Sequence, residues 1–199
     1  MIARRLRASV LATVVALALT GCGDDADGES TRTPEQAEVG FATDLLQHDA
    51  QVLALLDLAR ERILPAEVTT VLSEVQLHRA TEVEALTTLL AELSAPTPAT
   101  VRDHANVGHS EDGPHAADTE TGGDLPGMPD ADELNELTAA DDGEFARLLA
   151  ELLGELNDGA VEIADDYRGE LADGDGAELA DEVAAQREAE EKLLDQLSA

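Results

Sequence analysis

Hydrophobic residues recur at helical spacing in four long stretches of the chain, and helix-capping or helix-breaking residues bound each stretch. In the first stretch, Thr33-Pro34-Glu35-Gln36 supplies an N-cap, a proline at the first helical position and a capping-box partner. Its inward stripe runs to Leu64-Pro65, and a second helix is expected from about Ala66 to the Ser-Ala-Pro-Thr-Pro segment at 94–98. The expected inward residues are Ala42, Leu45, Val52, Leu56, Ala59 and Ile63, then Val68, Leu72, Val75, Leu86, Leu89 and Leu93.

The second half of the chain repeats this organisation. The pattern predicts a short helix from Asp132 to Leu137, a third long helix starting at 141–143, a turn at 172–176, and a fourth helix running to the C-terminus. The expected inward residues are Phe145, Leu149, Leu152, Leu156, Ala160, Ile163 and Tyr167, then Leu179, Val183, Leu193 and Leu197.

Short connections within each pair of helices predict antiparallel hairpins, 34–94 and 130–199. Residues 95–129 hold five of the seven prolines and are expected to form a long disordered linker between the hairpins. Aromatic residues make up only 2% of the chain and tryptophan is absent, so the core must be built from aliphatic side chains. These features predict an all-α fold, a four-helix bundle over residues 34–199.

The N-terminus has the pattern of a secretory signal. Three arginines precede an apolar run from Ala8 to Leu19 that is too short to span roughly 20 residues of hydrocarbon. Leu19-Thr20-Gly21-Cys22 resembles the bacterial lipobox, in which the cysteine receives a diacylglycerol and the chain is cut before it. We therefore expect a signal peptide at 1–21, lipidation at Cys22, a flexible tether at 22–33, and a protein of the cell envelope anchored outside the cytoplasm.

The net charge of the chain limits the classes of molecule that it can bind. The formal net charge is -32, and removal of the three signal arginines gives -32 - 3 = -35 for the mature form. Such a polyanion is repelled by the phosphates that dominate nucleic-acid affinity, which excludes DNA and RNA. An anionic membrane surface repels it as well, so the lipid at Cys22 is the expected membrane contact. The sequence indicates no particular protein partner.

Polar residues interrupt the inward stripes at one level of the predicted bundle. Asp49, with His48 beside it, lies between Leu45 and Val52, and antiparallel pairing about the Leu64-Pro65 turn places residue 49 opposite about residue 80. In the second hairpin, Asn157 falls opposite about residue 190. The sequence therefore predicts a buried polar layer, whose expected members are Asp49, Arg79, Glu82, Asn157, Gln186 and Glu190.

Several motifs around this layer resemble the bacterial ferritin-like family called domain of unknown function 305 (DUF305). Its members typically carry a phenylalanine followed seven residues later by a His-His pair, a returning Gln-x-x-Glu-Ile helix, and a Met-Pro-Gly-Met linker. Here these elements read Phe41 to His48-Asp49, Arg79-Ala80-Thr81-Glu82-Val83, and Leu125-Pro126-Gly127-Met128. The second copy runs from Phe145 to Leu156-Asn157. The resemblance covers about residues 36–198 and implies a ferritin-like bundle.

Some members of that family are implicated in binding metal, copper especially, but three of the four pair histidines are absent here. Two interpretations follow. His48, Asp49, His78 and Glu82 could still form a copper site, in an envelope protein that buffers or carries the metal. Alternatively, Asp49 and Glu82 neutralise Arg79, whose guanidinium replaces a cation, and His48 and His78 are partly exposed. We favour the ion pair, and hence no bound cofactor.

No catalytic set emerges from the sequence. It contains no Glu-x-x-His pair, no glycine-rich phosphate loop after a strand, no nucleophile elbow and no thiol besides Cys22. The linker histidines, His104, His109 and His115, match no compact metal motif, so a solvated loop is expected, with weak copper or zinc uptake as the alternative. The sequence thus favours a non-enzymatic, membrane-anchored binding or scaffold module.

Overall fold

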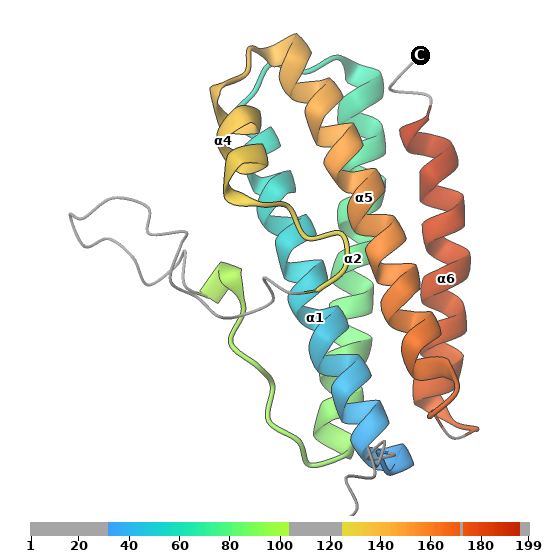
Figure 1. Cartoon of the computed structure of the whole chain (residues 1–199). Coiled ribbons are helices and arrows are strands. Elements are labelled where there is room, and N and C mark those ends of the chain that lie inside the picture. The colour runs from blue at the N-terminus through green and yellow to red at the C-terminus, as the bar shows by residue number, and fades with distance from the viewer. Residues whose placement is uncertain (1–31, 104–124, 172, 196–199) are drawn as a thin grey trace, which may run out of the picture. The chain divides into compact units, whose positions relative to one another are not determined.

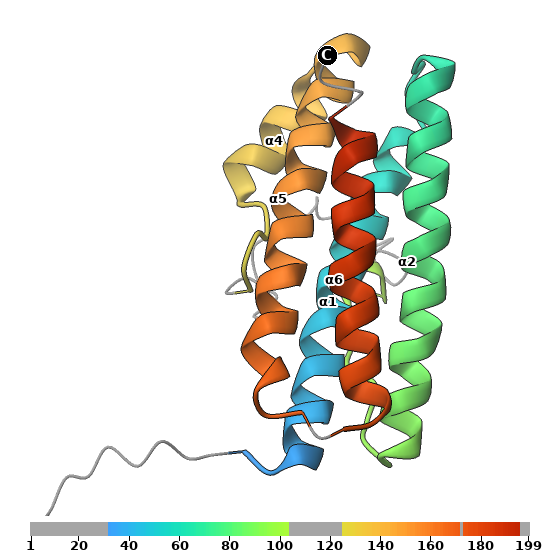
Figure 2. The same cartoon turned by 90° about the vertical axis from the view of Figure 1, so that its right-hand side faces the viewer.

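The computed structural model describes residues 32–103, 125–171 and 173–195, and within these ranges it is helical with no strand. The long helices are α1 (Pro34–Ala59), α2 (Ala66–Glu92), α5 (Asp142–Arg168) and α6 (Asp175–Leu194), with the short α4 (Ala131–Ala139) before α5. The helices α1 and α2 form one antiparallel hairpin and α5 and α6 the other, and α1 packs beside α5 (Figures 1 and 2). The predicted all-α bundle of two hairpins is confirmed for these residues.

Side-chain caps start the helices where the sequence places them. The Thr33 hydroxyl accepts from the Gln36 amide at 3.2 Å, and the Gln36 side chain accepts from the Thr33 amide at 2.9 Å, which forms a capping box. Asp130 and Glu133 form a second capping box at α4, and Asp141 caps α5. These contacts satisfy amides at the first helical turns, which have no partner within the helix.

The helix α1 ends earlier than the apolar stripe predicts. It stops at Ala59 and turns through residues 60–62, so the heptad spacing no longer applies at Ile63, whose surface is 87% exposed. The expectation that Ile63 faces inward was wrong for this reason. Arg62 fixes the turn by donating to the carbonyl oxygens of Thr138 and Ala140 at 2.8 and 2.9 Å.

The predicted linker is ordered at both ends, which corrects its bounds. Ala95 packs on the core after α2, and Arg102 contacts the Asp57 carboxylate at 2.9 Å. At the other end, Leu125 and Met128 pack against the core. The middle of the linker (104–124) lies outside the described residues, as do the predicted signal peptide, the tether up to residue 31, and the end of the fourth helix beyond residue 195.

The apolar core consists of two clusters. One lies where the end of α1 meets the starts of α2 and α5, and includes Phe145; the other lies at the opposite ends of the same helices, and includes Phe41 and Tyr167. Between them lie residues 48–49, 79–82, 157 and 187–190, which are the polar positions. The fold therefore places a polar layer across the middle of the bundle.

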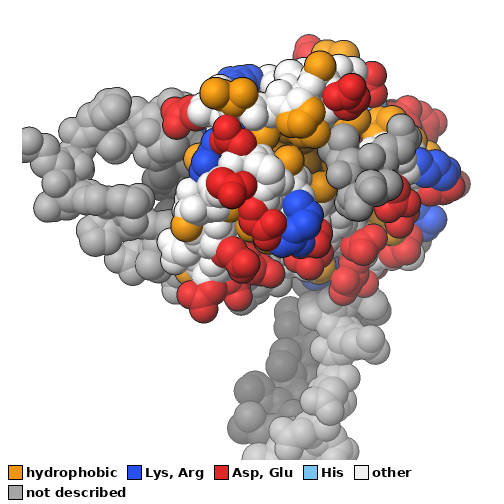
Figure 3. Space-filling model, turned by 90° about the horizontal axis from the view of Figure 1, so that it is seen from above, with side chains coloured by type: hydrophobic (Ala, Val, Ile, Leu, Met, Phe, Trp, Pro, Cys, Tyr) orange, Lys and Arg blue, Asp and Glu red, His pale blue; other side chains and the backbone are white. Residues whose placement is uncertain are grey.

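The surface is strongly acidic, in keeping with the composition. Acidic side chains surround the end of the bundle seen in Figure 3, with fewer basic ones among them. No helix within the described ranges combines the length and the hydropathy needed to cross a membrane.

Candidate functional site

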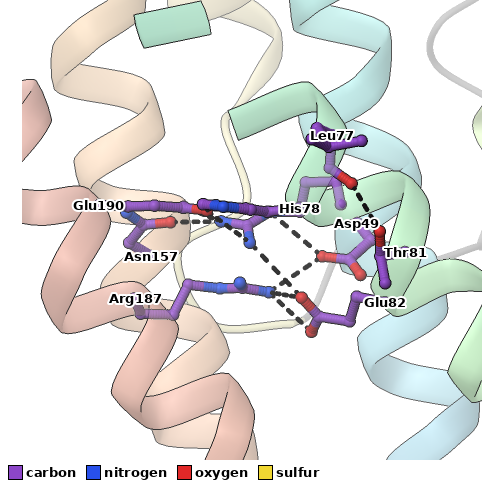
Figure 4. Close-up of polar contacts among 9 residues, drawn as sticks. Asp49, Leu77, His78, Thr81, Glu82, Asn157, Arg187 and Glu190 are labelled. Atoms are coloured by element: carbon purple, nitrogen blue, oxygen red, sulfur yellow. Dashed lines mark hydrogen bonds and ion pairs between the residues drawn. The ribbon is translucent and has the colours of Figure 1, made fainter. Parts of the chain in front are cut away.

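The buried polar layer brings together charged side chains from three helices and an amide from a fourth (Figure 4). The helix α1 supplies His48 and Asp49, α2 supplies Arg79 and Glu82, α5 supplies Asn157, and α6 supplies Arg187 and Glu190. None of these seven residues is more than 5% exposed. Charged groups at this depth require close partners of opposite charge.

Arg79 on α2 is the first centre of the network. Its Nη2 atom donates to Glu190 Oε2 and to Asn157 Oδ1, both at 2.6 Å. Its Nη1 atom reaches Glu190 Oε1 at 3.4 Å and Glu82 Oε2 at 3.5 Å, and its Nε atom lies 3.4 Å from Asp49 Oδ1. One guanidinium thereby joins α1, α2, α5 and α6, which suits its planar set of five donors.

Arg187 on α6 is the second centre, and the sequence prediction missed it. Its Nη2 atom donates to both carboxylate oxygens of Glu82 at 2.8 Å and to Asp49 Oδ1 at 3.1 Å. The expected layer member at this position, Gln186, is only half-buried, and its neighbour Arg187 takes its place, whereas Val183 and Glu190 are buried as predicted. The spacing of Val183, Arg187, Glu190 and Leu194 could have revealed this, because all four are buried on one face.

The two histidines occupy different environments. His78 is partly exposed at the edge of the layer, where its Nδ1 atom lies 3.1 Å from Glu190 Oε1. His48 is fully buried, which corrects the expectation that it is partly exposed, and neither ring nitrogen has a hydrogen-bond partner among the described residues. Burial and the nearby Arg79 charge lower the pKa of His48 to about 4, although the Pro126 carbonyl favours protonation, so the imidazole is neutral at ordinary pH.

The layer contains three carboxyl groups and only two guanidinium groups. Burial raises the pKa of Asp49 to about 7, against the opposing effect of Arg79. Burial and the neighbouring Asp49 carboxylate raise the pKa of Glu82 well above its usual value. Both shifts express the cost of a carboxylate charge in an apolar interior where the cations are shared.

The end of the predicted linker, residues 125–129, approaches α5 closely. Gly127 adopts a left-handed φ of 69°, and a Cβ atom there would meet the Glu155 carbonyl oxygen at 2.1 Å. On α5, a Cβ atom at Gly159 would meet the Pro126 carbonyl oxygen at 2.0 Å. Only glycines permit this approach of two backbones, and it places the Pro126 carbonyl within reach of His48.

The site geometry contains no ligand set for a metal. Within the described part of the chain, no three His, Cys, Asp or Glu side chains are arranged to hold a metal ion. Of the sequence-derived candidates, Asp49 and Glu82 contact the arginines, His78 contacts Glu190, and His48 makes no hydrogen bond with any of these carboxyl groups. Cys22 and the linker histidines lie outside the described residues.

Residues 38–198 match the domain of unknown function DUF305. The chain belongs to the DUF305 family. It is similar to the crystal structure of a DUF305 protein from Streptomyces coelicolor that is predicted to be secreted, at 22% identity and a TM-score of 0.65, covering 83% of this chain and 93% of the other. It is also similar to a DUF305 fragment from Deinococcus radiodurans, at 19% identity and a TM-score of 0.66, covering 84% and 98%.

No curated protein matches the sequence. The two DUF305 structures establish the fold, and the family assignment confirms the resemblance carried by the Phe41, Phe145 and Leu125-Pro126-Gly127-Met128 motifs. In this member of the family, the polar layer between the two apolar clusters is held by two arginines.

Proposed function

We propose that this DUF305 protein is a lipid-anchored, non-enzymatic module of the bacterial cell envelope, whose bundle is a rigid binding or scaffold unit held by ion pairs instead of a metal. The observation that carries the proposal is the position of Arg79 and Arg187, whose guanidinium groups contact all three buried carboxylates. A bound cation there would compete with two fixed positive charges.

The location rests on the N-terminal sequence. The basic start, the short apolar run and Leu19-Thr20-Gly21-Cys22 favour export and acylation of Cys22. The similar Streptomyces protein, itself predicted to be secreted, is consistent with a place outside the cytoplasm. The membrane would then be contacted through lipid, with the acidic bundle displayed from residues 22–33.

The anchoring is tested by fractionation of cells that express the full chain or the Cys22→Ser variant. The native chain should sediment with membranes and be released by detergent, whereas Cys22→Ser should lose the lipid and remain uncut. A Cys22→Ser protein that still carries lipid and sediments quantitatively would contradict the proposal.

The metal-free centre is tested by calorimetric titration with Cu(II) and with Zn(II), on mature protein in which His104, His109 and His115 are replaced by alanine. We expect no tight stoichiometric site. A submicromolar dissociation constant that disappears in the His48→Ala/His78→Ala variant would overturn the proposal in favour of copper or zinc binding. The same variant without metal reports whether these substitutions alter the fold.

A further inference from the structure

The acidic and basic groups of the buried network are unequal in number. Asp49, Glu82 and Glu190 contribute three carboxyl groups, and Arg79 and Arg187 contribute two positive charges. If all five groups were ionised, one negative charge would remain in the middle of the bundle. An uncompensated buried charge is costly enough that the group usually changes its protonation instead.

The three carboxyl groups are not equally well compensated. Glu190 accepts from Arg79 through both of its oxygens, at 2.6 and 3.4 Å, and also contacts His78 at 3.1 Å. Asp49 and Glu82 share the single Nη2 atom of Arg187, and their contacts with Arg79 are longer, at 3.4 and 3.5 Å. Asp49 Oδ2 has no hydrogen-bond partner among the described residues. The excess charge therefore falls on the Asp49–Glu82 pair.

We propose that the folded bundle binds one proton, shared by the carboxyl groups of Asp49 and Glu82, and that loss of this proton loosens the contact between α2 and α6. The inference rests on the metal-free network proposed above. The proton comes from solvent and converts one carboxylate to a neutral carboxyl group, which leaves two carboxylates against two guanidinium groups.

The titratable and charged groups that surround the pair come from the long helices. The helix α1 contributes His48 and Asp49, α2 contributes His78, Arg79 and Glu82, α5 contributes the uncharged Asn157, and α6 contributes Arg187 and Glu190. His48 is a poor site for the proton because Arg79 lies nearby and burial disfavours its charged form. The raised pKa values of Asp49 and Glu82 agree with a proton on the carboxyl pair.

A groove on the second hairpin borders the network. Asn157 and Arg187 line a groove of about 480 Å³ between α5 and α6. The contacts that join α2 to α6 pass through the same groups, because Arg187 holds Glu82 and Arg79 holds Glu190. Loss of the shared proton would leave Asp49 and Glu82 repelling each other across the Arg187 contact that joins the two hairpins.

The test is infrared difference spectroscopy of the purified mature chain near neutral pH, where a protonated carboxyl group has a carbonyl band separate from those of carboxylates. We expect the Asp49→Asn/Glu82→Gln variant to lack a band equivalent to one group per chain. The matched control is Glu162→Gln/Asp166→Asn, which makes the same chemical changes at exposed positions of α5 and should keep the band. A wild-type spectrum without this band, or a band that the network variant retains, would overturn the proposal.

The wild type alone provides a second readout. As pH rises, the band should disappear and hydrogen-exchange protection of α2 and α6 should fall together; unchanged protection after the band is lost would contradict the loosening. Metal analysis of the same sample separates the two proposals. Stoichiometric metal would contradict the metal-free network, whereas a metal-free sample without the band would overturn only the bound proton.

Discussion

Arg79 Nη2 donates to Glu190 Oε2 at 2.6 Å, although the two residues are 111 positions apart and belong to different hairpins. A second pair runs in the opposite direction, because Arg187 on α6 donates to Glu82 on α2 at 2.8 Å. Each hairpin thus supplies an arginine to a glutamate of the other. These two reciprocal contacts cross-link the hairpins at the level where the apolar core is interrupted.

Loss of Arg79 should be strongly destabilising. Arg79→Met leaves Glu190 without its arginine partner and removes one of the two arginines that contact Asp49. Removing one partner of a buried ion pair costs about 3–5 kcal/mol. The loss should shrink as pH falls, because protonation relieves the unpaired carboxylates. Urea denaturation measures both effects. The control Arg147→Met removes an arginine with two glutamate partners at the exposed surface of α5, and should change the free energy of unfolding little.

Asp49 should make the protein less stable as pH rises. Its pKa is raised from 3.8 to about 7, so the folded state binds a proton more tightly than the unfolded state between these values. The free energy of unfolding should therefore fall across this window. Asp49→Asn should flatten that dependence and be more stable than the wild type above the window, by at least about 1 kcal/mol. If the free energy of unfolding changes equally with pH in the wild type and in Asp49→Asn, Asp49 is not the group responsible.

His48 should act in the opposite direction. Its pKa is lowered from 6.5 to about 4, so the unfolded state binds the proton more tightly, and stability is lost as pH falls through this window. The loss attributable to His48 is on the order of 3 kcal/mol. Because the ring nitrogens have no partners among the described residues, His48→Leu should remove this loss without a large penalty at neutral pH. Urea denaturation of the wild type and of His48→Leu, at pH values above and below this range, measures the difference.

Two glycines of α5 provide a matched pair of substitutions. Gly154 has nothing within 4 Å of an added Cβ atom, whereas at Gly159 the Cβ atom would meet the Pro126 carbonyl oxygen at 2.0 Å. Gly154→Ala should stabilise the helix by up to about 1 kcal/mol through its propensity. Gly159→Ala has the same propensity gain, yet it should lower the melting temperature because the 125–129 segment must move. If both variants melt alike, that segment does not pack as described.

The sequence predicted the layer but not its full membership. Antiparallel pairing about Leu64-Pro65 correctly placed Asp49 against Arg79 and Glu82, because heptad spacing fixes which residues of a hairpin share a level. It failed at one position of α6, where it selected Gln186 although the neighbouring Arg187 is the buried residue. Charge could have decided between them, since three inward carboxyl groups need more than one arginine.

The other discrepancies have local causes. Ile63 follows a helix end that a stripe of apolar residues does not reveal, and its side chain is exposed. His48 was expected to be partly exposed because the ion-pair interpretation gave it no partner in the layer, but it is fully buried, and Pro126, distant in sequence, lies near it. Propensity and periodicity describe neighbours along one helix, whereas these features depend on what packs over it.

The central claim is that the two hairpins are held together by reciprocal arginine–glutamate pairs, and a double-mutant cycle on Arg79 and Glu190 tests it most directly. The variants are Arg79→Met, Glu190→Leu and their combination, compared by urea denaturation. Because the two side chains are in contact in the core, we expect each single variant to lose several kcal/mol and the double variant to lose less than their sum, with a coupling of about 0.5–3 kcal/mol. Losses that simply add would contradict the account.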